Sequence, residues 1–195
     1  MMDLLDATRQ ASAVVERETA DPAVRPGSRS RLLSHGSRTE RAVLATWLAQ
    51  NSADVVRHLL LLSPFFGPDP RQAPAWAVRP LTFLYGRGLL PDRVTSRGYS
   101  LTAVTRYLAI AHRLPGPPRR TRLRSLAVVI SETDGVVDPV AAFAVPRRIA
   151  AACGIRLRTH TLPASLGVGH DTLALIGPGA AGLRERYIEL SEGRP

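Results

Sequence analysis

The sequence has one cysteine, no lysine, few aromatic residues and no long apolar run. A single cysteine, Cys153, excludes an internal disulfide framework and a multi-cysteine zinc site. No uninterrupted apolar segment approaches the roughly 20 residues that cross a bilayer. The first residues lack the basic region and long apolar stretch of a signal peptide. We therefore expect a soluble cytoplasmic protein with no membrane span.

The absence of lysine affects how the positive net charge should be interpreted. All 26 basic residues are arginine, against 16 acidic residues, which gives a net charge of +10. A nucleic-acid-binding surface usually uses both cations, because either can contact phosphate. An arginine-only excess in a chain rich in Ala, Pro and Gly is typical of a GC-rich genome. We therefore do not expect nucleic acid as the main partner, although polyanion binding stays open as a third hypothesis because the charge acts at long range.

The length suits one domain, and the hydrophobic content of 45% suffices for a core. Apolar periodicity predicts helices and strands that alternate along the chain. This order predicts an α/β fold with a mostly parallel sheet flanked by helices. The expected helices are 3–19, 40–50, 101–113, 139–152 and 180–190, and the expected strands are 31–34, 59–62, 126–130 and 155–162.

Residues 67–120 differ in character from the rest of the chain. They are rich in proline and hold several aromatic residues, with one clear helical pattern at 101–113. We interpret this segment as a cap inserted into a single domain that covers residues 1–195.

Polar residues follow three of the expected strands, in the loops 34–39, 131–138 and 167–171. Ligands of parallel α/β sheets bind outside the carboxyl ends of the strands. The three loops supply a Ser, an Asp and a His in that order, which is the chain order of a hydrolase triad. In such a triad the His takes the proton of the Ser hydroxyl, and the Asp orients the imidazole.

Three segments resemble the C-terminal portion of the α/β-hydrolase fold family, over about residues 30–190. Residues 60–66, Leu-Leu-Leu-Ser-Pro-Phe-Phe, are similar to the strand before the family's cap. Residues 128–139 are similar to its acid loop, with the pattern Asp-x-x-Val-x-Pro, and 169–171, Gly-His-Asp, to its His loop. The family's early strands and one oxyanion N–H precede the nucleophile, and residues 1–30 offer no room for them.

The resemblance implies Asp134 as the acid and His170 as the base of the triad. Asp138 competes for the acid role, but it precedes Pro139 at a helix start, where Asp is a good N-cap and Pro suits the first helical position. The alternative for Asp134 is a turn residue. The alternative for His170 is a plain loop residue, with Asp171 capping the next helix.

The same resemblance implies Ser37 as the nucleophile and the backbone N–H of Arg38 as an oxyanion donor. The family's Gly-x-Ser-x-Gly turn carries His35 and Thr39 at its glycine positions here, and a Cβ there crowds the turn. In the neighbouring register Gly36 stands at the nucleophile position and no hydroxyl remains. The alternative for Ser37 is a turn or helix-cap residue.

These residues lead us to expect a serine hydrolase of esterase or lipase type that forms an acyl-enzyme on a small-molecule ester. Trp76, Phe83, Leu84 and Tyr85 of the cap would shape its acyl pocket. No metal or organic cofactor is implied. The alternative is a catalytically inactive hydrolase-like protein that acts by binding or by homo-oligomerisation through an exposed sheet edge.

Overall fold

The computed structural model describes residues 38–51, 56–95, 99–114, 122–173 and 180–194. Every described residue belongs to one compact unit, Ser37–Pro195. The expected helix 3–19 and strand 31–34 lie outside the described residues. In the described part of the chain, no helix is long and apolar enough to cross a membrane.

Three parallel strands form the sheet, in the order β1-β2-β3. They are β1 (His58–Leu62), β2 (Ser125–Ser131) and β3 (Leu157–Leu162). Each residue of β2 is buried, as its continuous apolar run predicts for a strand covered on both faces. The described strands therefore confirm the expected α/β class.

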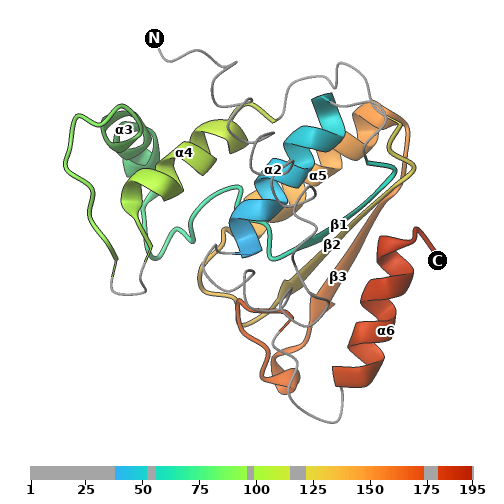
Figure 1. Cartoon of the computed structure of the whole chain (residues 1–195). Helices are drawn as coiled ribbons and strands as arrows, with labels where there is room; N and C mark the ends of the chain where they lie inside the picture. Colours follow the sequence, from blue (N-terminus) through green and yellow to red (C-terminus); the bar gives the residue numbers. More distant parts are fainter. Residues whose placement is uncertain (1–37, 52–55, 96–98, 115–121, 174–179, 195) are drawn as a thin grey trace, which may run out of the picture. The chain divides into compact units, whose positions relative to one another are not determined.

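Helices cover both faces of this sheet (Figure 1). On one face α2 (Arg38–Asn51) and α5 (Pro139–Cys153) pack against the sheet, and on the other face lies α6 (Ala180–Ser191). Side chains of β2 alternate between the two cores, because neighbouring residues of a strand point to opposite faces. Leu126 and Val128 face α2 and α5, whereas Ala127 and Val129 face α6.

The ends of α5 follow from local sequence. The Asp138 side chain accepts a hydrogen bond from the backbone N–H of Val140 at 2.8 Å, and Pro139 is the first helical residue. Gly154 ends the helix at φ 65°, a left-handed conformation that glycine adopts without a Cβ clash. Both features match the sequence-based expectation, and the Asp138 cap fixes where the acid-bearing loop ends.

Two helices lie between β1 and β2 in the chain, α3 (Ala75–Gly86) and α4 (Leu101–Ala111), and they pack against each other. The sequence pattern predicts α4 but not α3. Pro80 stands inside α3, where it removes one backbone hydrogen bond. Because a proline inside a sequence pattern usually argues against a helix, the pattern does not predict α3. The segment 67–120 is therefore more helical in its described part than its proline content indicates.

Candidate active site

Asp134 follows the carboxyl end of β2, and its side chain is only 2% exposed. Its Oδ1 atom accepts hydrogen bonds from the backbone N–H groups of Val136 at 2.9 Å and Val137 at 3.4 Å. Its own backbone N–H donates to the carbonyl of Ser131 at 3.1 Å. An Asp side chain that bonds to the backbone just ahead of it stabilises a tight turn. These bonds hold the carboxylate in one orientation.

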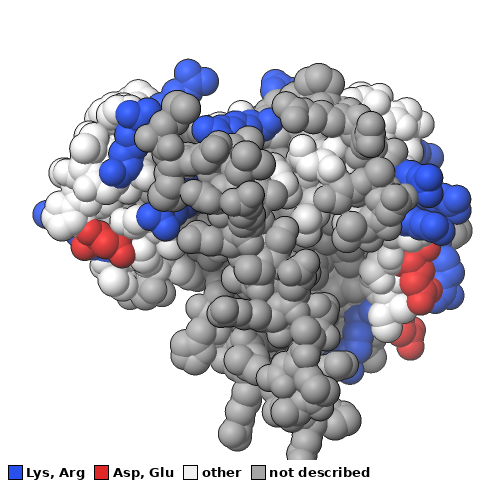
Figure 2. All heavy atoms as spheres, turned by 45° about the horizontal axis from the view of Figure 1, so that its top comes forward, with Lys and Arg blue, Asp and Glu red and all other residues white. Residues whose placement is uncertain are grey.

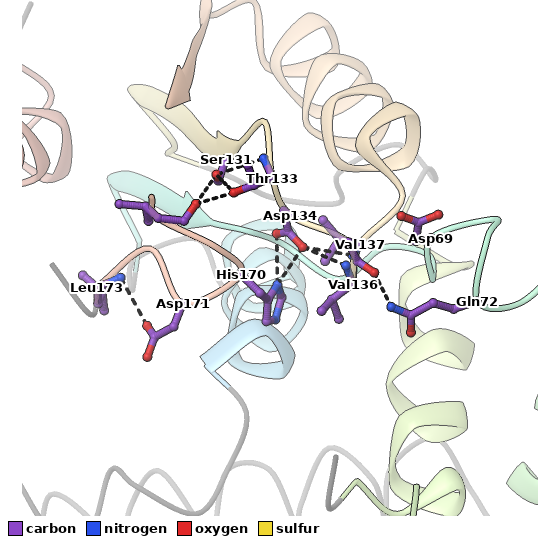
Figure 3. Close-up of polar contacts among 12 residues, drawn as sticks. Asp69, Gln72, Ser131, Thr133, Asp134, Val136, Val137, His170, Asp171 and Leu173 are labelled. Atoms are coloured by element: carbon purple, nitrogen blue, oxygen red, sulfur yellow. Dashed lines mark hydrogen bonds and ion pairs between the residues drawn. The ribbon is translucent and has the colours of Figure 1, made fainter. Parts of the chain in front are cut away.

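The segment after β1 clamps the loop that carries Asp134. The backbone N–H of Asp69 donates to the carbonyl of Val136 at 3.0 Å, and that of Asp138 donates to the carbonyl of Gly67 at 2.8 Å. The side-chain amide of Gln72 reaches the same loop and donates to a backbone carbonyl there (Figure 3). Backbone bonds of this kind need no particular side chains, so sequence patterns do not reveal them.

His170 lies in the loop after β3 and the short 3-10 helix η1 (Ala164–Leu166). Two hydroxyl groups at the end of β2 tie this loop down. Ser131 Oγ and Thr133 Oγ1 both donate to the carbonyl of Val168, the latter at 2.8 Å. The loops after two neighbouring parallel strands are thereby bonded to each other at the same edge of the sheet.

At this edge the structure brings Asp134 and His170 together (Figure 3). The Nδ1 atom of His170 lies 3.0 Å from Oδ2 and 3.1 Å from Oδ1 of Asp134. The His170 side chain is 20% exposed, while that of Asp134 is almost fully buried. An ionised carboxylate only accepts hydrogen bonds, so Nδ1 carries the proton and Nε2 is the basic nitrogen of the neutral ring.

Two opposing effects act on the pKa of Asp134. Burial raises it, because a charged carboxylate loses hydration. The hydrogen bond and charge of His170 and the N–H of Val136 are the largest effects that lower it. The net result is a pKa below the ordinary value of 3.8, so the group is anionic at neutral pH.

A second set of contacts, which includes one from α6, holds the loop that carries His170. The backbone N–H of Thr172 donates to the carbonyl of His170 at 3.0 Å, and the Tyr187 hydroxyl of α6 donates to the carbonyl of Thr172 at 3.1 Å. Asp171 accepts a hydrogen bond from the N–H of Leu173 at 3.2 Å. That bond closes a local turn, and α6 begins only at residue 180.

The two aspartates of the acid loop have separate roles in the structure. Asp138 caps α5 through its contact with Val140, and Asp134 faces His170. The sequence argument that divided these roles between the two residues rests on the same Asp-Pro helix start.

Ser37, the nucleophile that the resemblance implies, lies outside the described residues. Arg38 is the first residue of α2. Only residues 52–57 join the end of α2 to the start of β1, so the helix runs antiparallel to the strand (Figure 1). The N-terminal end of α2 therefore lies at the edge of the sheet where the strands end. The first N–H groups of a helix have no partner within the helix.

The four expected pocket residues all belong to α3 but lie on different faces of it. Trp76 is 80% exposed and Phe83 is 51% exposed, whereas Leu84 is half-buried and Tyr85 is buried. The guanidinium of Arg87 lies 4.7 Å from the centre of the Phe83 ring, within range of a cation–π contact. Trp76 and Phe83 are thus accessible on the outer side of α3, where Arg79 is exposed as well.

The other charged groups that the structure describes form no cluster of metal ligands. Among the described residues, no three His, Cys, Asp or Glu side chains lie close enough to hold a metal ion. On the face shown in Figure 2, arginines lie at several separate places, some with acidic side chains beside them. The buried carboxylate of Asp69 pairs with Arg71 at 2.6 Å, and this bond lowers the pKa of Asp69.

Sequence reasoning missed the residues that tie the site together. Ser131 and Thr133 stand at the end of a buried strand, and Tyr187 lies on the sheet-facing side of α6. A polar residue at the carboxyl end of an apolar strand is a usable signal, because a buried hydroxyl needs a partner. Which partner it finds depends on the neighbouring loops.

No protein-family model matches the chain, and no curated protein matches its sequence. Among solved structures, it is similar to a soluble variant of monoglyceride lipase from Saccharomyces cerevisiae, solved in complex with a substrate analog. The two chains are 10% identical with a TM-score of 0.52, and the match covers 77% of this chain. It covers 61% of the lipase chain, so this chain corresponds to only part of that protein. The likeness establishes an α/β-hydrolase-like fold.

Proposed function

We propose that the protein hydrolyses carboxylic esters through an acyl-enzyme, with Asp134, His170 and Ser37 as its triad. The observation that carries the proposal is the contact between His170 Nδ1 and the buried Asp134 carboxylate at the carboxyl edge of the sheet. The fold likeness to a monoglyceride lipase supports the same reaction class. The substrate class we propose is a small, apolar ester.

The chemistry follows from the protonation of the His170 ring. With Nδ1–H directed at Asp134, Nε2 is the nitrogen that takes the proton of the Ser37 hydroxyl. The Ser37 oxygen forms a bond to the ester carbonyl carbon, and the bond from that carbon to the alcohol oxygen breaks. His170 gives its proton to the departing alcohol. Water gives a proton to His170 and attacks the acyl carbon. The bond from that carbon to the Ser37 oxygen breaks, the acid leaves, and His170 returns the proton to Ser37.

Two further groups would stabilise charge during this reaction. Asp134 remains anionic because its pKa is low, and it balances the positive charge that develops on His170. The N–H of Arg38, at the start of α2, would donate to the carbonyl oxygen as it becomes negative. A helix N-terminus suits that role because its N–H groups are unpaired and its dipole favours negative charge.

The cap would supply the apolar contacts for the acyl chain. In this proposal Trp76 and Phe83 on the accessible face of α3 meet the substrate directly, and Leu84 and Tyr85 support them from the inner faces. The wide exposure of the two outer residues supports this division, because large apolar side chains that face solvent are available to a ligand.

The test is hydrolysis of nitrophenyl acetate, butyrate and octanoate by the full chain, beside three substituted proteins. Ser37→Ala, His170→Asn and Asp134→Asn each remove one proposed role. His160→Asn and Asp138→Asn are matched controls: His160 lies on β3, and asparagine at 138 preserves the helix cap. We expect loss of at least about 1000-fold in the first three proteins, with the controls near the parent rate.

Two results would overturn the proposal. A folded parent protein that hydrolyses none of the esters is not an esterase of this kind. Hydrolysis that survives Ser37→Ala but not His170→Asn would keep the base and remove Ser37 as the nucleophile.

A further inference from the structure

Ser63 follows β1 directly and has an unusual backbone. Among the described residues it is the single non-glycine residue with a positive φ, at 43°. This region is unfavourable for residues with a Cβ atom. Strained residues persist only where their surroundings hold them, and they cluster at functional sites. The strain at Ser63 therefore calls for a reason.

The backbone around Ser63 is held firmly. Its N–H donates to the carbonyl of Val129 at 2.9 Å, which extends the pairing of β1 with β2 one residue beyond Leu62. Pro64, which follows it, is fully buried. This arrangement directs Ser63 toward the edge of the sheet where Asp134 lies, since β1 and β2 are neighbouring parallel strands.

The Ser63 hydroxyl is buried, and no well-formed hydrogen bond to it is seen among the described residues. The residue is 2% exposed, and its Oγ atom has neither solvent contact nor a hydrogen bond of normal geometry among the described residues. The other described hydroxyl in this state is that of Thr82. A buried hydroxyl that stays unbonded costs free energy, so a nearby acceptor is expected.

The Asp134 carboxylate has room for such a donor. Its Oδ1 atom accepts from two backbone N–H groups and His170, whereas Oδ2 accepts from His170 alone among the described residues. A carboxylate offers about four acceptor positions. Burial raises the pKa of Asp134, and the groups that lower it include the Ser63 hydroxyl, after His170 and Val136.

We infer that Ser63 is a positioning residue of this site: its hydroxyl donates to the Asp134 carboxylate and holds it against His170. The strained backbone fixes the hydroxyl beside the acid. No contact with substrate is implied, because Ser63 is buried. The effect on rate rests on the proposed esterase function, while the contact with Asp134 does not.

The test follows the Asp134 carboxyl by ¹³C NMR through an acid titration of the full chain labelled at aspartate. The signal is assigned by its loss in Asp134→Asn. Ser63→Ala removes the hydroxyl and keeps the strain; Ser63→Gly removes both. Thr82→Val is the matched control, because it removes the other unbonded buried hydroxyl. We expect a higher Asp134 pKa in both Ser63 variants and no change in Thr82→Val.

The kinetic readout is kcat for nitrophenyl butyrate, with an expected loss of about tenfold in both Ser63 variants. An unchanged Asp134 titration in the two folded variants would overturn the inference. A change in Ser63→Gly alone would also overturn it, because that result assigns the effect to the relieved backbone strain and not to the hydroxyl. If Ser63→Ala does not fold, Ser63→Gly carries the test. If the parent has no esterase activity, the proposed function fails and the titration still decides on Ser63.

Discussion

The Nδ1 atom of His170 lies 3.0 Å from Oδ2 of Asp134, although 36 positions of sequence separate the two residues. The contact forms because β2 and β3 are adjacent and parallel, so the loops after them leave the sheet at the same edge. Hydrogen bonds from Ser131 and Thr133 to Val168 then fix one loop against the other.

Asp134→Asn should lower kcat for nitrophenyl butyrate by about 1000-fold or more. An amide cannot balance the charge on His170, and it allows the ring to adopt the wrong tautomer. Circular dichroism would confirm that the variant is folded. A loss below tenfold would show that the contact is structural and has no part in catalysis.

The low pKa of Asp134 should make stability depend on pH. A carboxyl whose pKa is lower in the folded state stabilises the fold above its unfolded pKa, near the ordinary 3.8, and this contribution is lost as pH falls through the folded pKa. Urea unfolding at pH 7 and pH 3 would measure it. The stability advantage of the parent over Asp134→Asn should be larger at pH 7; an equal difference at both values would contradict the prediction.

Tyr187→Phe should reduce the free energy of unfolding by about 1 kcal/mol. The substitution deletes the hydroxyl that donates to the carbonyl of Thr172 and leaves that buried acceptor unbonded. The ring itself remains packed between α6 and the sheet. Chemical denaturation would give the value, and a phenylalanine variant as stable as the parent would show that this bond contributes nothing.

Asp138→Ala should cost about 1 kcal/mol, because the first turn of α5 loses its side-chain cap. Asp138→Asn is the control and should stay within a few tenths of a kcal/mol of the parent. Both would be measured by urea denaturation. Equal losses in the two variants would mean that the carboxylate charge, and not the cap, matters at this position.

Two glycine substitutions should change stability in opposite directions. Gly154→Ala should destabilise the protein by about 1 kcal/mol, because Gly154 has φ 65° and a Cβ is strained there even in open space. Gly182→Ala, inside α6 and also in open space, should stabilise it by up to about 1 kcal/mol. Thermal unfolding would compare them, and a stable Gly154→Ala protein would refute the argument from backbone conformation.

Much of the fold was predictable from local patterns. The apolar run at 126–130 predicted a strand buried on both faces, and the structure has β2 there with every residue buried. Asp138, Pro139 and Gly154 marked the ends of α5. The helix α3 was not predictable in the same way, because Pro80 interrupts its pattern and tertiary packing overrides that local signal.

The candidate site also has features that the sequence predicted and features that it did not. Sequence order suggested an Asp and a His on loops after neighbouring strands, and the Asp-Pro helix start separated Asp138 from Asp134. No sequence pattern identifies the backbone hydrogen bonds of Gly67 and Asp69 to the loop that carries Asp134. No pattern identifies the strained, buried Ser63 either. These features depend on backbone groups, which every residue has, and on one rare φ value, which the residue type Ser does not predict.

By itself the sequence determined the alternation of helices and strands, the apolar character of β2 and the ends of α5, because these depend on neighbours a few positions apart. Only the tertiary structure decided that Asp134 is buried, that its pKa falls despite burial, and that it meets His170. These properties arise where loops from different strands meet, and the energy of a buried charge depends on every group around it. The sequence gives the order of these groups along the chain, but only the folded structure determines the distances between them.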